Sequence, residues 1–182
     1  MTENARQAFA VWLTGLPSSG KSTIAAALDR QLRSRGVNVA VLESDALRRD
    51  LTPQPIFSAP ERETFYASMV WLGALIVDHG IAVVFDATAN KREYRDRARA
   101  HIARFIEVLV DTPLDRCMAR DTKGIYRKAQ QGEAPAVPGV TAVYEPPVFP
   151  ELRVSGVEPA ERAAAAIVAA LESRGYVPAA AV

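Results

Sequence analysis

The chain has little of what marks a secreted protein, a zinc protein or a membrane protein. Its 182 residues include one cysteine, Cys117, and two histidines, so no internal disulfide can form and no cysteine–histidine cluster has zinc-site spacing. No apolar run approaches the 18 residues of a membrane span, and the first residues lack the basic start and cleavage site of a signal peptide. We therefore expect a soluble, untargeted protein of the reducing cytoplasm.

A strong excess of charge is also absent. Lys plus Arg (22) nearly balance Asp plus Glu (21), which leaves a net charge of +1. No broad face for nucleic acid is indicated at this balance, so any anion must be bound locally. The length and the 49% hydrophobic content suffice for one core but not for two. We expect a single domain over residues 1–182.

What the sequence does contain is an alternation of apolar strands and helices. Apolar runs typical of strands occupy residues 8–14, 37–43, 81–87 and 105–112. Helical spacing occupies residues 21–36, 61–80, 91–103 and 159–176. Because parallel strands need helical crossovers, we predict an α/β fold with a parallel sheet covered by helices on both faces. Ligands of such sheets bind beyond the carboxyl ends of the strands.

The segment from about residue 121 to 150 breaks this alternation. Residues 122–152 hold five of the 12 prolines and show little periodicity. A connection of this length in a compact domain is usually a functional lid or a disordered insertion. We expect a lid in this C-terminal part of the chain.

A phosphate-binding motif lies between the first predicted strand and helix. The stretch GLPSSGKST, residues 15–23, fits G-x-x-x-x-G-K-[S/T], although a glycine-rich turn could match by chance. In such a loop, backbone N–H groups and the helix N-terminus bind phosphates, a lysine reaches the β- and γ-phosphates and a hydroxyl completes a Mg²⁺ shell. The residues predicted to bind ATP are Gly15, Ser18, Ser19, Gly20, Lys21, Ser22 and Thr23. Lys21 is also a predicted catalytic residue, and Ser22 a predicted metal ligand.

Three carboxylates follow the ends of the next two predicted strands. Phosphoryl transfer to a hydroxyl needs Mg²⁺ and a carboxylate that accepts or orients the hydroxyl proton. We assign the proton to Asp45, assistance at Mg²⁺ to Glu43, and a water-mediated Mg²⁺ contact to Asp86. Two plainer interpretations stay open. Residues 43–51 could be only a capped turn, and Asp86 could cap the helix that begins near Asn90.

Several segments resemble the adenylylsulfate (APS) kinases, in the order found in that family. They are the phosphate loop, the acidic pair with Arg48, the FS at 57–58, the long segment 110–133 and the YEPP at 144–147. The resemblance runs from about residue 10 to 176. It implies the three-layer sandwich of P-loop NTPases with a lid, ATP and Mg²⁺ as cofactors, and transfer of the ATP γ-phosphate to the 3′-hydroxyl of APS. That reaction forms PAPS in sulfate assimilation.

The resemblance also implies roles for individual residues. Arg120 falls where the family's arginine lies against the ATP adenine. The positions that it assigns to the acceptor are Arg48, Phe57, Arg62, Lys123, Lys128 and Val140. The alternative for Lys123 and Lys128 is that they are ordinary exposed lysines of a loop with no role in binding. The expected partner is therefore a small-molecule nucleotide, with no nucleic acid and no membrane, and the sequence leaves a homodimer open.

Departures from the family pattern lie on the acceptor side. Ala46 replaces the Asn of D-G-D-N-x-R, and D-R-x-E-N-x-R-R reads ERETFYAS, which keeps only Arg62 as a charge partner. Ala87 replaces the serine of F-I-S-P, and Val137 replaces the lid aromatic that stacks on APS. These changes motivate a second hypothesis, a kinase for another small hydroxyl- or amidate-bearing metabolite. A third is a nucleotide-binding switch that only orders its 123–147 lid; the absence of N-K-x-D counts against a GTPase.

Overall fold

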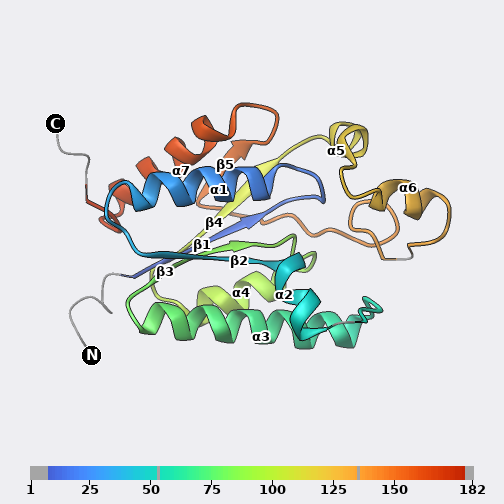
Figure 1. Ribbon diagram of the computed structural model, residues 1–182, viewed down its shortest axis with the longest axis horizontal. Helices are drawn as coiled ribbons and strands as arrows, with labels where there is room; N and C mark the ends of the chain where they lie inside the picture. Colours follow the sequence, from blue (N-terminus) through green and yellow to red (C-terminus); the bar gives the residue numbers. More distant parts are fainter. Residues whose placement is uncertain (1–7, 53, 135, 179–182) are drawn as a thin grey trace.

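The computed structural model describes residues 8–52, 54–134 and 136–178, and it forms three layers (Figure 1). Five parallel strands in the order β2–β3–β1–β4–β5 make the middle layer. The strands are β1 (Ala10–Thr14), β2 (Val39–Glu43), β3 (Ala82–Asp86), β4 (Phe105–Asp111) and β5 (Leu152–Ser155). The helices are α1 (Lys21–Arg33), α2 (Ser44–Leu51), α3 (Ala59–Asp78), α4 (Arg92–His101), α5 (Leu114–Arg120), α6 (Ile125–Gln130) and α7 (Ala160–Ser173).

The central strand β1 is buried throughout and apolar up to Thr14 at its end, because helices cover both of its faces. Val11 and Leu13 point to the layer of α1 and α7, whereas Ala10 and Trp12 point to the layer of α3 and α4. Successive side chains of a strand face opposite sides, so an unbroken apolar run is expected where helices cover both faces. Trp12 stacks on Phe85 of β3 at 4.5 Å between ring centroids. The predicted P-loop NTPase sandwich is confirmed.

The fold contains four short elements beyond the expected strands and helices, namely β5, α2, α5 and α6, and two of them show why. The edge strand β5 has four residues with only one buried, so it gives no apolar run. The helix α6 has six residues and lies inside the proline-rich segment, where the Asp121 carboxylate accepts hydrogen bonds from the backbone N–H groups of Tyr126 and Arg127. Elements of this length leave little periodicity in a sequence.

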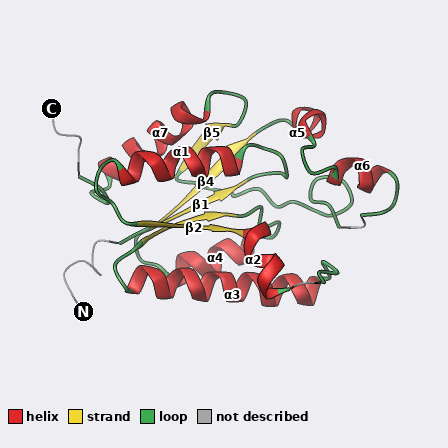
Figure 2. Cartoon of the chain, in the orientation of Figure 1, coloured by secondary structure: helices red, strands yellow, loops and turns green. Residues whose placement is uncertain are grey.

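The predicted lid forms a third apolar cluster beyond the carboxyl ends of the strands. Figure 2 shows α5 and α6 beside the three layers; α5 follows β4 closely, and a long loop leads from α6 back to β5. Cys117 of α5 packs with Tyr126 and Ala129 of α6 and with Val137. The Tyr126 hydroxyl donates to the carbonyl of Pro17 at 2.8 Å, so the lid rests on the phosphate loop.

The return segment of the lid is anchored by the YEPP motif. Tyr144 shares a hydrogen bond of 3.1 Å with the Thr14 hydroxyl at the end of β1. The Glu145 carboxylate accepts from the backbone N–H of Arg92 at 2.9 Å, at the start of α4. Among the helices that the structure describes, none combines the length and the apolar character needed to cross a bilayer.

Candidate active site

One cavity of about 920 Å³ opens at the carboxyl ends of β1, β2 and β3. The phosphate loop and the start of α1 form one wall, and α2, the segment 55–66 and the lid form the other. We call these walls the phosphate half and the acceptor half. Sheets of this topology are expected to bind ligands at this edge, and the volume is typical of a small-molecule site.

The phosphate half depends on a backbone that only glycine permits at Gly15. Gly15 has φ 155°, and a Cβ there would lie 2.6 Å from the carbonyl oxygen of Val110. The loop then bends so that the side chain of Lys21, the first residue of α1, lies against the backbone of the loop. Its ammonium donates to the carbonyls of Leu16 at 2.8 Å and Gly15 at 3.1 Å.

Lys21 is a buried ammonium without a carboxylate within salt-bridge distance among the described residues. Burial lowers its pKa from 10.5 to about 8, although the negative charge of Asp86 acts in the opposite direction. A desolvated cation of this kind interacts strongly with an anion that enters the cavity. The position therefore suits binding of a phosphate.

The nucleotide end of the cavity includes a segment that the sequence analysis did not assign. Gly156, directly after β5, lies so close to the phosphate loop that an added Cβ would be 2.0 Å from the carbonyl oxygen of Ser19. That carbonyl accepts from the hydroxyl of Thr112 at 2.8 Å and from Arg120 at 3.4 Å. A strand assigned to 152–155 would have indicated this segment, because its carboxyl end meets the same edge of the sheet.

The three carboxylates meet at this edge because β2 and β3 are paired. Glu43 and Asp86 occupy neighbouring positions in the parallel register. Asp86 is buried, and it lines the cavity together with Ser22. Burial raises the pKa of Asp86 above its ordinary value, although the Ser22 hydroxyl and the charge of Lys21 act in the opposite direction.

The capping interpretation of Asp86 is wrong, whereas residues 43–51 do form a strand-to-helix turn with Glu43 at the N-cap. The helix α4 begins at Arg92 after an N-cap at Lys91, so Asp86 does not cap it. Glu43 is the N-cap residue of α2, but its side chain makes no cap hydrogen bond. Asp45 lies in the first turn of α2 and is exposed to the cavity.

Lys123 of the lid reaches both acids at the end of β2. Its ammonium pairs closely with the Asp45 carboxylate and lies 3.9 Å from that of Glu43. Burial lowers the pKa of Lys123, but the hydrogen bond and charge of Asp45 outweigh this effect and raise it above its ordinary value. Because about half of both side chains is exposed, water screens the pair and its contribution to folding is small.

Arg48 is buried in the acceptor half between an acid and two rings. Its guanidinium donates to Glu61 at 2.9 Å and lies 3.8 Å from the ring centroid of Phe65 and 5.0 Å from that of Phe57. Glu61 is a partner that the sequence analysis did not identify. It also accepts from the backbone N–H groups of Ile56 and Phe57, so it holds the wall and the arginine together.

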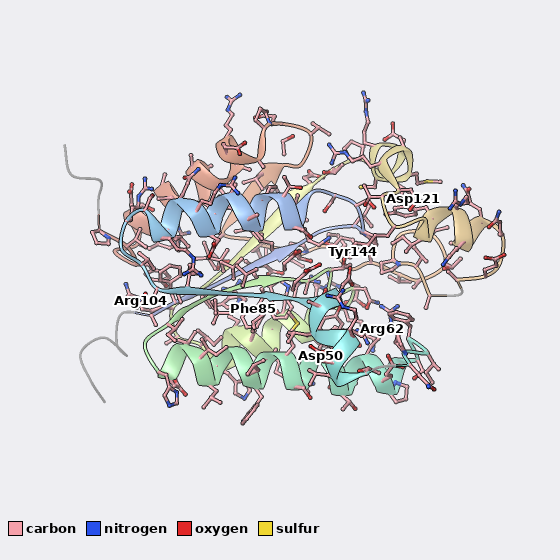
Figure 3. The ribbon with its side chains drawn as sticks, viewed as in Figure 1. Asp50, Arg62, Phe85, Arg104, Asp121 and Tyr144 are labelled. Atoms are coloured by element: carbon pink, nitrogen blue, oxygen red, sulfur yellow. The ribbon has the colours of Figure 1, made fainter. Side chains whose placement is uncertain are left out.

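Arg62 differs from Arg48 because all its hydrogen-bond partners are neutral. It donates to the carbonyl of Phe57 at 3.0 Å, to the side-chain oxygen of Asn90 at 3.1 Å and to the carbonyl of Ala136 at 2.6 Å. Burial lowers the pKa of Arg62 below its ordinary value. Figure 3 labels Arg62 and Tyr144 at the lid end of the molecule.

The residues present suit Mg²⁺ bound together with phosphates. Across the described residues, no group of three or more His, Cys, Asp or Glu side chains converges on a metal position. Mg²⁺ usually keeps several waters and takes only one or two carboxylates besides substrate phosphates. The Ser22 hydroxyl and the Asp86 carboxylate, which both line the cavity, meet that need.

Comparison with known proteins agrees with this geometry. The family model for adenylylsulphate kinase matches residues 7–155. The chain belongs to the adenylylsulfate kinase family. An adenylyl-sulfate kinase from Rippkaea orientalis is 37% identical over 172 residues, which are 94% of this chain and 95% of that protein. As a member of this family, the chain is an ATP-dependent phosphotransferase.

Solved structures support both the family and the wider fold. The APS kinase CysC of Mycobacterium tuberculosis, in complex with AMPPNP and APS, has a TM-score of 0.86 and 34% identity, covering 91% of this chain and 98% of its own. Shikimate kinase from Aquifex aeolicus is 17% identical with a TM-score of 0.55, covers 92% of this chain and 98% of its own, and shows a shared fold alone.

For this APS kinase family member, the structure brings most of the predicted residues to one cavity. Of the predicted site residues, Gly15 and Val140 are not among the described residues that line the cavity. Gly15 contributes through its backbone conformation and its close contact with Val110. Val140 is 41% exposed in the turn that follows Val137, and Val137 and Pro138 line the acceptor half in its place.

Proposed function

We propose that this protein transfers the γ-phosphate of ATP to the 3′-hydroxyl of APS and forms PAPS. The observation that carries the proposal is the single cavity in which the phosphate loop faces Asp45 and the acceptor-half residues Arg48, Phe57 and Arg62. The relative from Mycobacterium tuberculosis, which binds AMPPNP and APS in its solved structure, supports the same pair of substrates.

Asp45 is the proposed proton acceptor. The 3′-oxygen forms a bond to the γ-phosphorus, the bond from that phosphorus to the β–γ bridging oxygen breaks, and the hydroxyl proton passes to the Asp45 carboxylate. Lys123 of the lid pairs with this carboxylate on the wall of the cavity. Lys21 is placed to stabilise charge on the phosphates, and Lys128 on the lid wall would add to it.

Ser22 and Asp86 are the proposed holders of Mg²⁺, with Glu43 beside them in register. The ion would neutralise charge on the β- and γ-phosphates. On the nucleotide side, Arg120 lines the cavity and donates to the loop carbonyl of Ser19, a position that supports contact with the ATP base.

The acceptor half supports an anionic nucleotide. Arg62 lines the cavity and has no carboxylate within 4.0 Å among the described residues, so its charge is uncompensated at close range. A desolvated cation of this kind favours an anion such as the phosphosulfate of APS. Phe57, which is 42% exposed, offers a ring on which a base can stack.

A second candidate is a kinase of the same family that acts on another small acceptor. The observation in its favour is the environment of Arg48, whose charge is already compensated by Glu61 and which stacks on Phe65 where the family has an asparagine. An acceptor with less negative charge would then suffice.

A coupled assay of ADP release tests the proposal. We expect release from ATP and Mg²⁺ to accelerate strongly when APS is added, with PAPS as the product. Release that does not respond to APS, followed by a response to another hydroxyl-bearing metabolite, would favour the second candidate. No release with any acceptor, together with ATP-dependent ordering of the lid, would support a nucleotide-binding switch.

The proposal extends to location and assembly. We propose a cytoplasmic enzyme, because a chain with one cysteine needs no oxidising compartment. The homodimer left open by the sequence is to be tested by light scattering of the purified chain.

A further inference from the structure

We propose that Asn90 is a positioning residue for the acceptor, which orients Arg62 in the cavity and ties the return segment of the lid to the edge of the sheet. The part of this proposal that concerns binding of the acceptor rests on the proposed function. Asn90 lies four residues after the end of β3, and only 8% of it is exposed. It is not among the described lining residues of the cavity, so it acts through its neighbours.

The Asn90 side chain makes one hydrogen bond to α3 and one to the return segment of the lid. Its amide oxygen accepts from the Arg62 guanidinium at 3.1 Å, and its amide nitrogen donates to the carbonyl of Val143 at 3.1 Å. Its backbone carbonyl accepts from the N–H of Glu145 at 2.8 Å. One residue thus connects α3 with two positions on the return segment of the lid.

Arg62 extends the connection to the other side of the lid. Its Nη1 binds Asn90, and its Nη2 donates to the carbonyl of Ala136 at 2.6 Å. Asn90 and Arg62 together therefore hold Ala136, Val143 and Glu145, on both sides of the lid turn at 137–142. The side chains of Asn90 and Arg62 therefore fix both the position of the lid over the acceptor half and the orientation of the Arg62 guanidinium.

The position of Asn90 is itself fixed. Ala89 has φ 43°, a conformation that costs free energy for a residue other than glycine unless its surroundings hold it. Its N–H donates to the Tyr66 hydroxyl at 3.1 Å, and its carbonyl accepts from the buried Arg95. Arg95 also donates to the carbonyl of Glu145 at 2.7 Å, so the turn and the lid share a second support.

A neutral amide is the group that this position needs. It accepts from Arg62 without compensating its charge, and it donates to a carbonyl at the same time. An aspartate would accept from Arg62 but would neutralise it, and it could not donate to Val143. Asn90 thus keeps Arg62 both oriented and available to an anionic acceptor, unlike Arg48, which Glu61 pairs.

Two variants separate orientation from charge. In Asn90→Ala both contacts are lost, and loss of hydrogen bonds to a charged group predicts a rise in the KM for APS on the order of tenfold to a hundredfold. In Asn90→Asp the contact to Arg62 persists as an ion pair, and we expect the KM for APS to rise at least as far because the charge is compensated. The KM for ATP should stay within about twofold in both variants.

A second readout does not depend on the acceptor. Limited trypsin digestion reports opening of the lid through cleavage after Lys123, Arg127 and Lys128, which are exposed. We expect Asn90→Ala to be cut several-fold faster than the wild type. The control is Asn38→Ala, in an exposed loop before β2 at the opposite end of the sheet, which should change neither readout.

The outcomes separate this proposal from the proposed function. Equal tryptic rates in the wild type and Asn90→Ala would overturn the tie to the lid, even if APS is not the acceptor. Equal rises in the KM for ATP and APS, with a lowered melting temperature, would show a merely structural role and overturn the positioning role. If wild-type turnover does not respond to APS but Asn90→Ala is cut faster, the proposed function fails and the tie to the lid stands.

Discussion

The two halves of the cavity are built in different ways. The phosphate half comes mainly from consecutive residues, 15–23, and relies on backbone geometry and one helix N-terminus. The acceptor half is assembled from side chains of α2, α3, the turn after β3 and the lid, with contacts such as Arg62 to Ala136 that span 74 positions. The first half is a local property of the sequence, and the second is a tertiary one.

This difference agrees with the departures that the sequence resemblance implies, which lie on the acceptor side. Phosphate contacts through backbone groups restrict a few residue types, chiefly glycine and lysine, so the motif is retained. Side chains of the acceptor half can change in groups when their partners change. Phe65 accepts the stacked guanidinium of Arg48, and Glu61 compensates its charge. The comparison implies that changes in one half leave the other half largely unaffected.

The largest expected effect tests whether Asp45 belongs to the reaction and not to binding. Asp45→Asn keeps the shape but removes the base, so we expect turnover to fall about 100- to 10,000-fold, with the Kd for ATP within about threefold. ADP release and calorimetric titration with an ATP analogue measure the two quantities. The matched control is Asp50→Asn, an exposed position on the same helix, labelled in Figure 3, with little expected effect. A turnover equal to the wild type would remove Asp45 from the mechanism.

An intermediate effect is expected from a change confined to the acceptor half. Phe57→Ala removes a ring that can stack on a base, which predicts a rise in the acceptor KM of roughly 5- to 150-fold from a loss of about 1–3 kcal/mol. The KM for ATP should not change. Phe149→Ala is the control, since Phe149 is 88% exposed and is not among the described lining residues. An equal rise in both KM values would contradict the separation of the halves.

The smallest expected effect concerns pH and the phosphate half. If the protonated form of Lys21 binds phosphate as proposed, its pKa of about 8 predicts that kcat/KM for ATP falls as the pH rises through about 8, up to tenfold per pH unit. Bound phosphates raise this pKa, so the fall in kcat should occur at higher pH. Initial rates from pH 6.5 to 9.5 measure both profiles. A kcat/KM for ATP that stays constant to pH 9.5 would show that the lysine is not desolvated in the free enzyme.

The sequence predicted the phosphate half almost completely. Strand, glycine loop and helix follow one another at 8–36, and each has a local signal that does not depend on distant residues. The carboxylates Glu43 and Asp86 were predicted to meet because parallel strands end at one edge, and the register places them side by side. Their roles stay predictions.

The acceptor half was predicted only as a set of positions. The partnership of Arg48 with Glu61, and that of Arg62 with Asn90, had no signal in the spacing, because each joins elements that the chain brings together only on folding. Val140 illustrates the same point: the lid turn at 137–142 presents Val137 and Pro138 to the cavity and leaves Val140 41% exposed. A segment rich in proline and poor in periodicity gives no basis for choosing which residue faces inward.

The sequence by itself determined the layered α/β fold, the phosphate loop and the edge of the sheet that carries the site, because periodicity and short motifs are local and follow from backbone geometry. Only the tertiary structure decided which charges are compensated: Arg48 by Glu61, Asp45 by Lys123, and Arg62 by no carboxylate within 4.0 Å among the described residues. The physical reason is that the free energy of a charge depends on burial and on partners within a few ångströms. Those distances are set only when α3, the turn at Asn90 and the lid pack against one another.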